Sequence, residues 1–488
     1  MKLAELVFIP YPGISHLQST VKIAKLLVDR DDRLFITVLV IKLQALTSLN
    51  AQTDDVVVST GSERIKFIEL PPYNEGHPGK FRSVLLERRK SHVRDIVAEL
   101  VRSRASRADS PHLAGLVIDM FCVTMIDVAN EFGIPTYVFY TSGAGFLGLM
   151  FHLQHLHDQN NVNPTELQND PDAELVVPCF VDPVPTSSLP YAAVAEGWSS
   201  LFIQYTRRMR EIKGIIVNSF VDLESFVVSS MLHSRLPSLY LVGPVLSLKD
   251  DPDRCKASSG ESDTDNIMKW LNDQLPLSVV SLCFGTMGFF RVDQLNEIAC
   301  ALEQCEHRFL WSVRKPPPTD KSVIYSMPSD YSDLMDALPE GFLDRTAKRG
   351  RVIGWAPQVD IMAHQAIGGF VSHCGWNSIL ESIWFGVPIA TWPIYAEQHL
   401  NAFQMVKELG VAEAISLDFK SGFYIESERS VLEAREIEGG IRRLMEHGNG
   451  IRSRAREMSK RSREAVMEGG SSYSSLGRLI NDVMDNIP

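Results

Sequence analysis

The residues best suited to chemistry lie in a short window from Trp355 to Gln398. Its middle, 369–372, has the apolar composition of a parallel strand buried on both faces, and a glycine-containing turn follows it. Asn377 and Ser378 then begin a predicted helix, because both side chains can accept hydrogen bonds from the free amides at helix starts. That first turn leaves about four N–H groups unpaired and carries about half a positive charge. A diphosphate is a natural ligand for such a helix end.

Two further side chains extend this site towards a complete nucleotide. Glu381 lies four residues after Asn377, on the same face of the predicted helix, where its carboxylate could accept bonds from both ribose hydroxyls. Trp355 offers a flat face for a base, and stacking of this kind is worth about 1–3 kcal/mol. Each residue alone would suit an ordinary α/β core equally well. Together they place several polar groups around one turn, which is costly in a mere core. The window therefore predicts a site for a nucleotide diphosphate carrying a sugar.

A candidate general base lies near the other end of the chain. His16 closes the segment 10–16, which directly follows the first predicted strand, so it lies at the strand end where open parallel sheets bind ligands. A neutral imidazole there could take a proton from a hydroxyl, which contributes about 10²–10⁴-fold to a rate. Asp119 ends another strand at the same edge and could fix the tautomer of the imidazole. Taken alone, however, these two residues would more often be a helix cap and a loop acid.

The elements that must position these residues alternate between strand and helix. In the first half, apolar strands are predicted at 6–9, 34–40, 115–118, 136–140, 214–218 and 239–242, with helices at 17–27, 85–101 and 123–132. After a polar stretch the alternation restarts, with helices at 267–274, 292–303, 398–409, 434–446 and 451–467 and strands at 279–284 and 309–313. Alternation of this kind predicts parallel, doubly wound sheets. We therefore expect an α/β protein with two Rossmann-like domains facing a central cleft.

The domain boundaries follow from composition. We expect an N-terminal domain at 1–247 and an interdomain linker at 248–266, which is rich in Asp, Ser and Gly. A nucleotide-binding domain should follow at 267–460, and C-terminal helices at 461–488.

Composition narrows the function without identifying it. The 488 residues are 45% hydrophobic and 22% charged, as in a globular protein, and the net charge of -12 argues against nucleic acid and anionic membranes as partners. Seven cysteines without a CxxC spacing indicate reduced thiols rather than a disulfide framework or a zinc site. No signal peptide or membrane span is apparent. We therefore expect a cytoplasmic protein without a membrane anchor.

The window 355–398 resembles the signature box of plant secondary-product UDP-glycosyltransferases (glycosyltransferase family 1), in its length and in its fixed residues. The resemblance extends from the Pro-Gly-x-x-His that ends at His16 to the Gly-Gly-Ser-Ser at 469–472. It implies the GT-B type of two-domain fold, with the last helix (474–483) crossing back onto the first domain. It also implies a monomeric, inverting, metal-independent enzyme with UDP-glucose as co-substrate and no cofactor. Such an enzyme transfers glucose to a hydroxyl of a small lipophilic acceptor (a flavonoid, another phenolic or a terpenoid) and forms a β-O-glucoside.

The resemblance also assigns roles to residues. His16 would be the base and Asp119 its partner. Donor-binding roles fall on these positions: Thr141, Gly285, Thr286, Trp355, Ala356, Gln358, His373, Gly375, Trp376, Asn377, Ser378, Glu381, Tyr395, Glu397 and Gln398. Within that set the uracil ring of the donor would stack on Trp355, and Gln358 with Glu381 would hold the ribose. The phosphates would meet 373, 377 and 378, while 376, 397 and 398 would contact the sugar, with Ser142 beside Thr141.

Three positions depart from the common family pattern. Ser15 stands where Gly is usual before the base, Thr286 replaces Ser, and Glu397 replaces Asp with its carboxylate kept. Gln398 at the end of the box favours glucose over galactose. The acceptor pocket should be apolar and aromatic, and its candidate residues, for each of which core packing is an equal alternative, are Ser15, Phe121, Phe146 and Phe202, together with Tyr395.

Several patterns suggest other functions. The 143–148 segment matches G-x-G-x-x-G, but no second strand ending in an acid follows about twenty residues later, as dinucleotide binding requires. Three D-x-D triplets, at 170–172, 251–253 and 263–265, lie in polar segments and suggest solvated charge rather than a metal site. His152, His155 and His157 lack a completing acid or cysteine. The alternatives left open are an NAD-linked oxidoreductase and an inactive nucleotide-sugar-binding protein. Retention of the His16 and Asp119 pair speaks against the inactive form.

Overall fold

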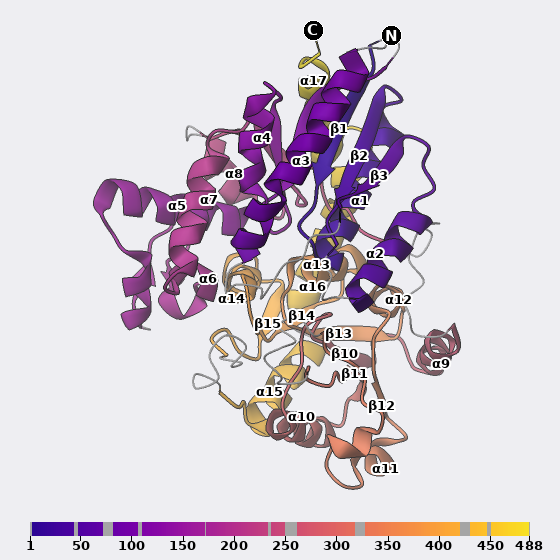
Figure 1. Cartoon of the computed structure of the whole chain (residues 1–488). Coiled ribbons are helices and arrows are strands. Elements are labelled where there is room, and N and C mark those ends of the chain that lie inside the picture. The colour runs from indigo at the N-terminus through magenta and orange to yellow at the C-terminus, as the bar shows by residue number, and fades with distance from the viewer. Residues whose placement is uncertain are drawn as a thin grey trace.

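In the computed structural model, the described residues are 2–42, 47–71, 82–105, 110–170, 172–232, 236–248, 261–317, 327–419, 430–446 and 450–487. They form two α/β units, each built on one parallel sheet, which lie one above the other in Figure 1. We call the unit containing β1 to β9 the N-terminal unit and the one containing α9 to α16 the C-terminal unit. This is the pair of Rossmann-like units that the strand–helix alternation predicts.

The sheet of the N-terminal unit has the strand order β3-β2-β1-β4-β5-β8-β9, with every described pair parallel. Its strands are β1 (Ala4–Ile9), β2 (Leu34–Val40), β3 (Ile65–Glu69), β4 (His112–Asp119), β5 (Thr136–Tyr140), β8 (Gly214–Val217) and β9 (Ser238–Leu241). Its longer helices are α1 (Ile14–Arg30), α2 (Thr47–Ser59), α3 (Arg82–Ala105), α5 (Ala144–Asn160) and α7 (Trp198–Met209). Shorter ones are α4 (Ile126–Glu131), α6 (Tyr191–Val194) and α8 (Ser225–Leu232), and β6 (Glu174–Leu175) pairs with β7 (Val184–Pro185) outside the sheet.

Both faces of this sheet are covered, which explains why its central strands are apolar throughout. Successive side chains of a strand point to opposite faces. In β1, Val7 and Ile9 therefore pack with α3, α4 and α5, whereas Leu6 and Phe8 pack with α1 and α17. The strand ends, rather than the faces, are thus left to carry function.

The sheet of the C-terminal unit has the order β12-β11-β10-β13-β14-β15, again parallel throughout its described pairs. Its strands are β10 (Val279–Cys283), β11 (Arg308–Ser312), β12 (Gly350–Ile353), β13 (Ile367–Ser372), β14 (Ile389–Thr391) and β15 (Ala412–Ala414). Its helices are α9 (Glu261–Asn272), α10 (Val292–Gln304), α11 (Phe342–Thr346), α12 (Gln358–Ala363), α13 (Trp376–Phe385), α14 (Gln398–Phe403), α15 (Ala434–Met445) and α16 (Gly450–Val466).

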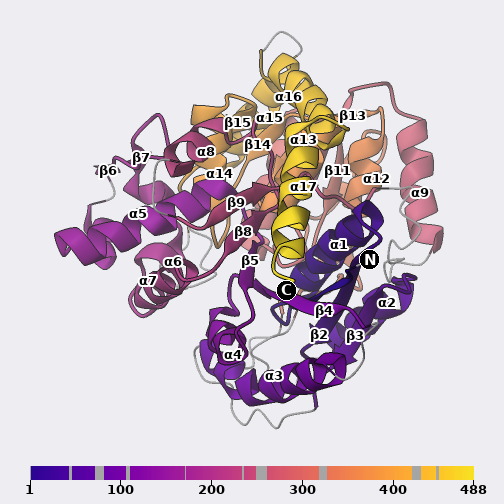
Figure 2. The same cartoon turned by 90° about the horizontal axis from the view of Figure 1, so that it is seen from above.

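The last helix, α17 (Ser471–Met484), returns to the N-terminal unit. Leu476, Leu479 and Ile480 are buried in the core that α1 shares with β1. Beyond the helix, the Asn486 side chain donates to the Ala114 carbonyl at 2.8 Å. Figure 2 shows α17 lying beside α1, and both chain ends lie at the top of the molecule in Figure 1.

Several predicted elements differ from those observed. The helix expected at 123–132 is a 3₁₀ turn at 123–125 followed by α4. Helix α9 begins at Glu261, inside the expected linker, so Asp263 and Asp265 lie on a helix rather than in a loop. The polar start of α9 has loop-like composition, but its buried Ile267 and Leu271 belong to the core of the C-terminal unit. The single helix expected at 398–409 is α14 followed by a π-helical turn at 404–408. Much of the predicted linker, including the 251–253 triplet, lies outside the described residues.

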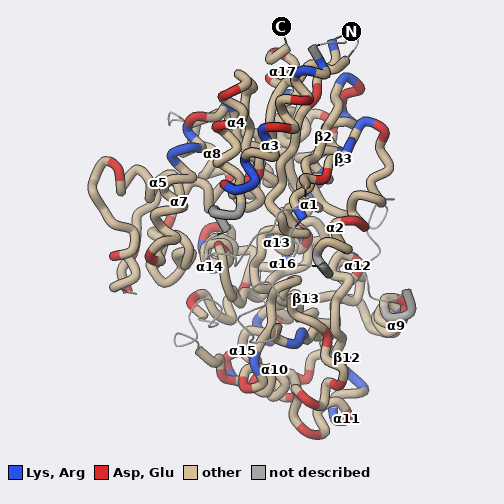
Figure 3. Tube along the Cα trace, in the orientation of Figure 1, with Lys and Arg blue, Asp and Glu red and all other residues tan. Residues whose placement is uncertain are grey.

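Among the described residues, no helix combines the length and apolarity needed to cross a membrane. The six cysteines in the described ranges are all free thiols, and Cys255 lies outside those ranges. Acidic and basic residues are interspersed along the helices of both units in the view of Figure 3.

Candidate active site

The candidate base lies at the carboxyl edge of the N-terminal sheet. His16 is in the first turn of α1, which follows β1, and Asp119 is the last residue of the neighbouring strand β4. His16 Nδ1 and Asp119 Oδ2 are 2.7 Å apart, with the His16 side chain 21% exposed and the Asp119 side chain fully buried. The other Asp119 oxygen, Oδ1, accepts the Phe121 amide at 2.9 Å, which fixes the carboxylate. The imidazole is thus held through Nδ1, and Nε2 is the nitrogen left for proton transfer.

Aromatic rings surround this pair. The ring centroids of Tyr11 and Phe121 lie 5.2 and 5.7 Å from that of His16. The ring centroid of Phe202 lies 6.1 Å from that of Phe121, and the ring centroid of Phe146 lies 6.1 Å from that of Phe202. The three predicted acceptor phenylalanines therefore form one connected group beside the base, with Phe121 half-buried and the other two buried. Sequence reasoning missed Tyr11, although its place in the turn after β1 could have indicated it.

The predicted phosphate turn joins β13 to α13 in the C-terminal unit. Cys374 adopts a positive φ of 62°, which is uncommon for a non-glycine residue, and Asn401 donates to its carbonyl at 3.0 Å. The helix begins at Trp376 after the N-cap residue Gly375, which has no side-chain cap bond. Asn377 and Ser378 are therefore the second and third helical residues, rather than the cap that the sequence suggests. The N-cap residue therefore offers no side-chain acceptor to the first backbone amides of α13.

The imidazole of His373 fills the centre of this turn. A Cβ atom added at Gly285 or Gly375 would stand 2.6 or 2.5 Å from His373 Nε2, so glycine is what lets both backbones approach the ring. The Gly285 turn, with φ +75°, thereby joins the site, whereas the neighbouring Thr286 is exposed. Burial lowers the pKa of His373 to about 4, so the ring is neutral near pH 7.

The two residues predicted to hold a ribose contact each other. Gln358, the first residue of α12, donates through Nε2 to Glu381 Oε2 at 2.6 Å and to Ser378 Oγ at 2.9 Å. The amide thus connects α12 to α13 and orients the carboxylate. Trp355 lies half-buried between β12 and α12, and Ala356 packs in the adjoining core.

The end of the box interacts electrostatically with the candidate base, His16. Gln398 Oε1 accepts the amides of Ile394 and Tyr395, each at 3.0 Å, which leaves its Nε2 as a donor. Burial raises the pKa of the Glu397 carboxyl, while the Ser142 hydroxyl and His16 act in the opposite direction. The Tyr395 ring centroid lies 6.4 Å from that of His373.

Thr141 and Trp376 bring the two units together. Thr141 follows β5, and its Oγ1 lies 3.3 Å from His16 Nδ1. The Trp376 indole N–H donates to the Asn218 carbonyl at 2.7 Å, so it is engaged with the N-terminal unit. The carboxyl edges of the two sheets therefore meet at this point. Ser15, in the first turn of α1, is exposed.

The competing patterns find no supporting geometry. The first amides of α5, within the G-x-G-x-x-G segment, donate to the Glu224 carboxylate rather than facing a phosphate. Asp170 and Asp172 are exposed. Within the described ranges, no group of three or more His, Cys, Asp or Glu side chains is placed to hold a metal ion.

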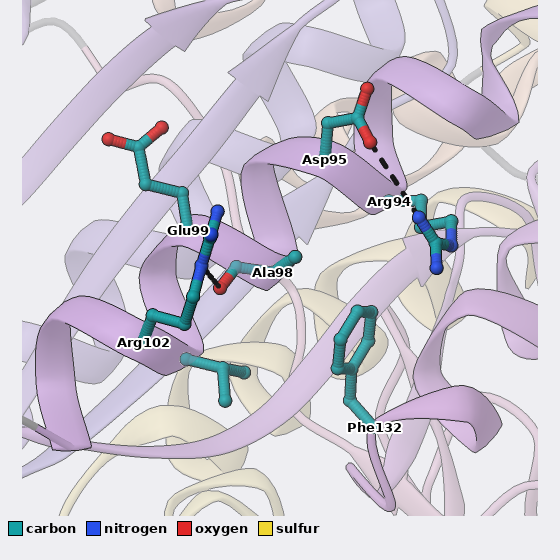
Figure 4. A pocket seen from close by; sticks show the side chains of 7 residues that line it. Arg94, Asp95, Ala98, Glu99, Arg102 and Phe132 are labelled. Atoms are coloured by element: carbon teal, nitrogen blue, oxygen red, sulfur yellow. Dashed lines mark hydrogen bonds and ion pairs between the residues drawn. The ribbon is translucent and has the colours of Figure 1, made fainter.

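A surface cavity of about 540 Å³ lies beside α3. Figure 4 shows that charged side chains of α3 and the ring of Phe132 line it. Its lining includes none of the predicted site residues. We therefore do not connect it with the candidate active site.

Two Rossmann-like units that meet at their sheet edges, one with a diphosphate turn and the other with an imidazole–carboxylate pair, define a nucleotide-sugar glycosyltransferase. The family described as UDP-glucoronosyl and UDP-glucosyl transferase matches residues 255–426. A putative UDP-glucose flavonoid 3-O-glucosyltransferase 3 of Fragaria ananassa is 50% identical to this chain, with 99% of this chain and 100% of that protein covered. This chain therefore belongs to the UDP-glycosyltransferase family.

Solved structures agree over the whole length. A UGT transferase from Siraitia grosvenorii in complex with UDP is 47% identical, with a TM-score of 0.86 over 99% of this chain and 100% of that chain. UGT71G1 of Medicago truncatula complexed with UDP-glucose is 40% identical, with a TM-score of 0.81 over 99% of this chain and 98% of that one. The predicted GT-B fold and UDP-glycosyltransferase activity are thus confirmed, and the NAD-linked alternative is set aside. The roles of individual residues stay predictions.

Proposed function

We propose that this enzyme transfers glucose from UDP-glucose to a hydroxyl of a small lipophilic acceptor, with inversion, and releases a β-O-glucoside and UDP. The observation that carries the proposal is the 2.7 Å contact between His16 Nδ1 and Asp119 Oδ2, at the end of the N-terminal unit that contacts the other unit through Trp376. The Fragaria relative is named for a flavonoid acceptor, and the aromatic group around His16 suits a flat phenolic of that kind.

In this mechanism His16 Nε2 accepts the proton of the acceptor hydroxyl as its oxygen attacks the anomeric carbon. Asp119 holds the tautomer with Nε2 free and stabilises the imidazolium that forms. The bond from the anomeric carbon to the UDP oxygen breaks on the opposite face, so an α-linked donor gives a β-product. The reaction passes through an oxocarbenium-like transition state, as in glycoside hydrolysis.

The C-terminal unit would hold the donor and receive the charge of the leaving diphosphate. The start of α13 supplies backbone amides and a helix dipole, and neutral His373 adds a ring N–H donor. The Gly285 turn adds further amides. Gln358 and Glu381 would hold the ribose, and Trp355 the uracil.

The sugar would lie between the two units. Glu397 and the free Nε2 of Gln398 would contact its hydroxyls, with Thr141 on the other side. Because the indole N–H of Trp376 is engaged by Asn218, Trp376 would contact the sugar through its backbone amide.

We further infer that the reaction needs neither a metal nor a cofactor, since the residues named above supply the base and the diphosphate contacts. We also infer a monomer, and a cytoplasmic location consistent with the free thiols of the described cysteines. A chelator should leave the rate nearly unchanged, and strong inhibition by it would contradict the metal-independent mechanism.

The test is a donor-by-acceptor screen of the purified full chain, with product analysis by NMR to identify the anomer and the hydroxyl used. His16→Ala should reduce transfer by at least about 10²-fold while leaving the Kd for UDP nearly unchanged. His112→Ala is the matched control, because His112 is exposed at the opposite end of β4. Equal losses of transfer and UDP affinity in His16→Ala would contradict the assignment of the base. Failure of every UDP-sugar as donor would contradict the function itself.

A further inference from the structure

A buried carboxylate that the proposed mechanism does not use lies where the two units meet. Glu224 is 2% exposed and immediately precedes α8. Its Oε2 accepts the Ala144 amide at 2.9 Å, and its Oε1 accepts the Gly145 amide at 2.7 Å. These are the first two amides of α5, whose N-cap residue Gly143 offers no side-chain cap. Glu224 therefore supplies, from a distant part of the chain, the two acceptor oxygens that the uncapped start of α5 requires.

The same carboxylate reaches the C-terminal unit. Gln404 Nε2 donates to Glu224 Oε1 at 3.4 Å. Gln404 begins the π-helical turn that follows α14, and α14 begins at Gln398. One buried acid thus connects the start of α5 with the segment that carries the predicted sugar-binding residues.

A second contact from the same loop runs in parallel. Asn218, which precedes Glu224 in the loop between β8 and α8, accepts the Trp376 indole N–H. A Cβ atom at Gly143 would stand 2.8 Å from the Trp376 ring and 3.0 Å from Glu224 Oε1. The backbone at Gly143 is therefore packed between the acid and the first residue of α13.

The segment that these contacts fix is Thr141–Ser142, which links β5 to α5. The residues beside this segment, His16 and Glu397, have roles in the proposed mechanism. Thr141 Oγ1 lies 3.3 Å from His16 Nδ1, and the Ser142 hydroxyl interacts with the Glu397 carboxyl. A displacement of the α5 start would move this segment relative to the donor sugar. Displacements of about 1 Å can cost about 10²-fold in rate when they misplace reacting groups.

We propose that Glu224 is a positioning residue, which fixes the start of α5 against the C-terminal unit so that Thr141 and Ser142 face the donor sugar. This inference rests on the proposed function, because it requires a sugar bound between the units. It separates the sugar from the nucleotide, since UDP would be held by the C-terminal unit alone.

The test is Glu224→Gln in the full chain. Glutamine keeps the size of the side chain but offers one acceptor oxygen, so one of the two α5 amides loses its partner. We expect kcat/KM for UDP-glucose to fall at least about tenfold, while the Kd for UDP changes less than about twofold. Glu131→Gln, which alters an exposed acid of the same unit, is the matched control and should change neither value. A purely structural role would weaken both in proportion, and that result would overturn the proposal.

Two further measurements keep the proposal falsifiable. Amide hydrogen exchange of the unliganded protein should rise at 144–145 and around Trp376 in Glu224→Gln, and unchanged exchange at both places would overturn it. Gln404→Leu, which leaves the α5 cap in place, should show the same division between sugar and UDP with a smaller effect; if Glu224→Gln does not fold, wild-type kinetics in Gln404→Leu would overturn the proposal. Wild-type turnover in the same assay tests the function separately, because the exchange result does not depend on transfer.

Discussion

At the scale of single residues, the chemistry depends on which protonation state burial permits. Two histidines of the candidate site differ in their burial and in their contacts. His16 is partly exposed and contacts a carboxylate, which suits a group that must gain and lose a proton. His373 is buried between two glycine backbones without a charged partner, which suits a neutral donor to a diphosphate.

The burial of His373 predicts a loss of stability in acid. Its folded pKa of about 4 lies below the ordinary value of 6.5, so the unfolded chain takes up this proton first as the pH falls. The stability that neutral His373 contributes to the fold is fully present above pH 6.5 and is lost progressively between pH 6.5 and 4. The loss reaches about 2 kcal/mol at pH 5. The measurement is urea unfolding at pH 7.5 and pH 5, compared with His373→Gln, which cannot titrate. We expect a shallower pH dependence in the variant, and parallel dependences would contradict the prediction.

At the scale of elements, the site is made by turns that follow strands. The ends of β1, β4 and β5 and the turns after them carry the candidate base, its partner and Thr141, and the segments after β10, β12, β13 and β14 carry the other candidate donor residues. Helices cover both faces of each sheet, so polar groups can converge at the carboxyl edge of its strands. The contact of Gln358 on α12 with Glu381 on α13 shows how two such turns combine into one subsite.

That subsite predicts the effect of Glu381→Ala. Loss of a carboxylate that accepts ribose hydroxyls should cost about 1.5–3 kcal/mol, or about 10- to 160-fold in the KM for UDP-glucose. Glu413→Ala is the control, because Glu413 lies on β15 of the same unit, outside the candidate site, and pairs with Arg443. Steady-state kinetics with donor varied at saturating acceptor make the comparison. An unchanged donor KM would contradict the ribose role.

At the scale of the whole molecule, α17 places the last helix of the chain against the first, α1. It packs beside α1 on the N-terminal sheet, although the preceding α16 belongs to the C-terminal unit. This return constrains the two units independently of the contacts at Trp376 and Glu224. The relative placement of base and donor therefore depends on a helix that contributes no candidate site residue.

Leu479 measures that docking. It is 1% exposed in the core shared by α17, α1 and β1, so Leu479→Ala should reduce the free energy of unfolding by about 2–5 kcal/mol. The control is Leu275→Ala at a side chain that is 70% exposed, where we expect a change within about 0.5 kcal/mol. Denaturant unfolding of both variants decides the matter. Equal stabilities would show that α17 docks without contributing to the fold.

Much of this molecule could be predicted locally. Strand–helix alternation predicted both sheets, because burial on two faces imposes apolar strands between amphipathic helices. The strand ends at Ile9 and Asp119 placed His16 beside its partner, since neighbouring parallel strands end at one edge. The box from Trp355 to Gln398 predicted the family, which the comparisons confirmed.

Other features required the tertiary structure, because they depend on contacts between residues far apart in sequence. The helix start at Trp376 was missed because Gly375 can precede a helix without a side-chain cap, whereas Asn377 and Ser378 have the composition of a cap. Glu224 gave no signal in the sequence, since its partners lie about 80 residues before it at Ala144 and 180 residues after it at Gln404. The sequence by itself determined the fold, the family and the residue types of the site. Only the folded chain decided how the two sheet edges meet, because that meeting is set by packing across the units.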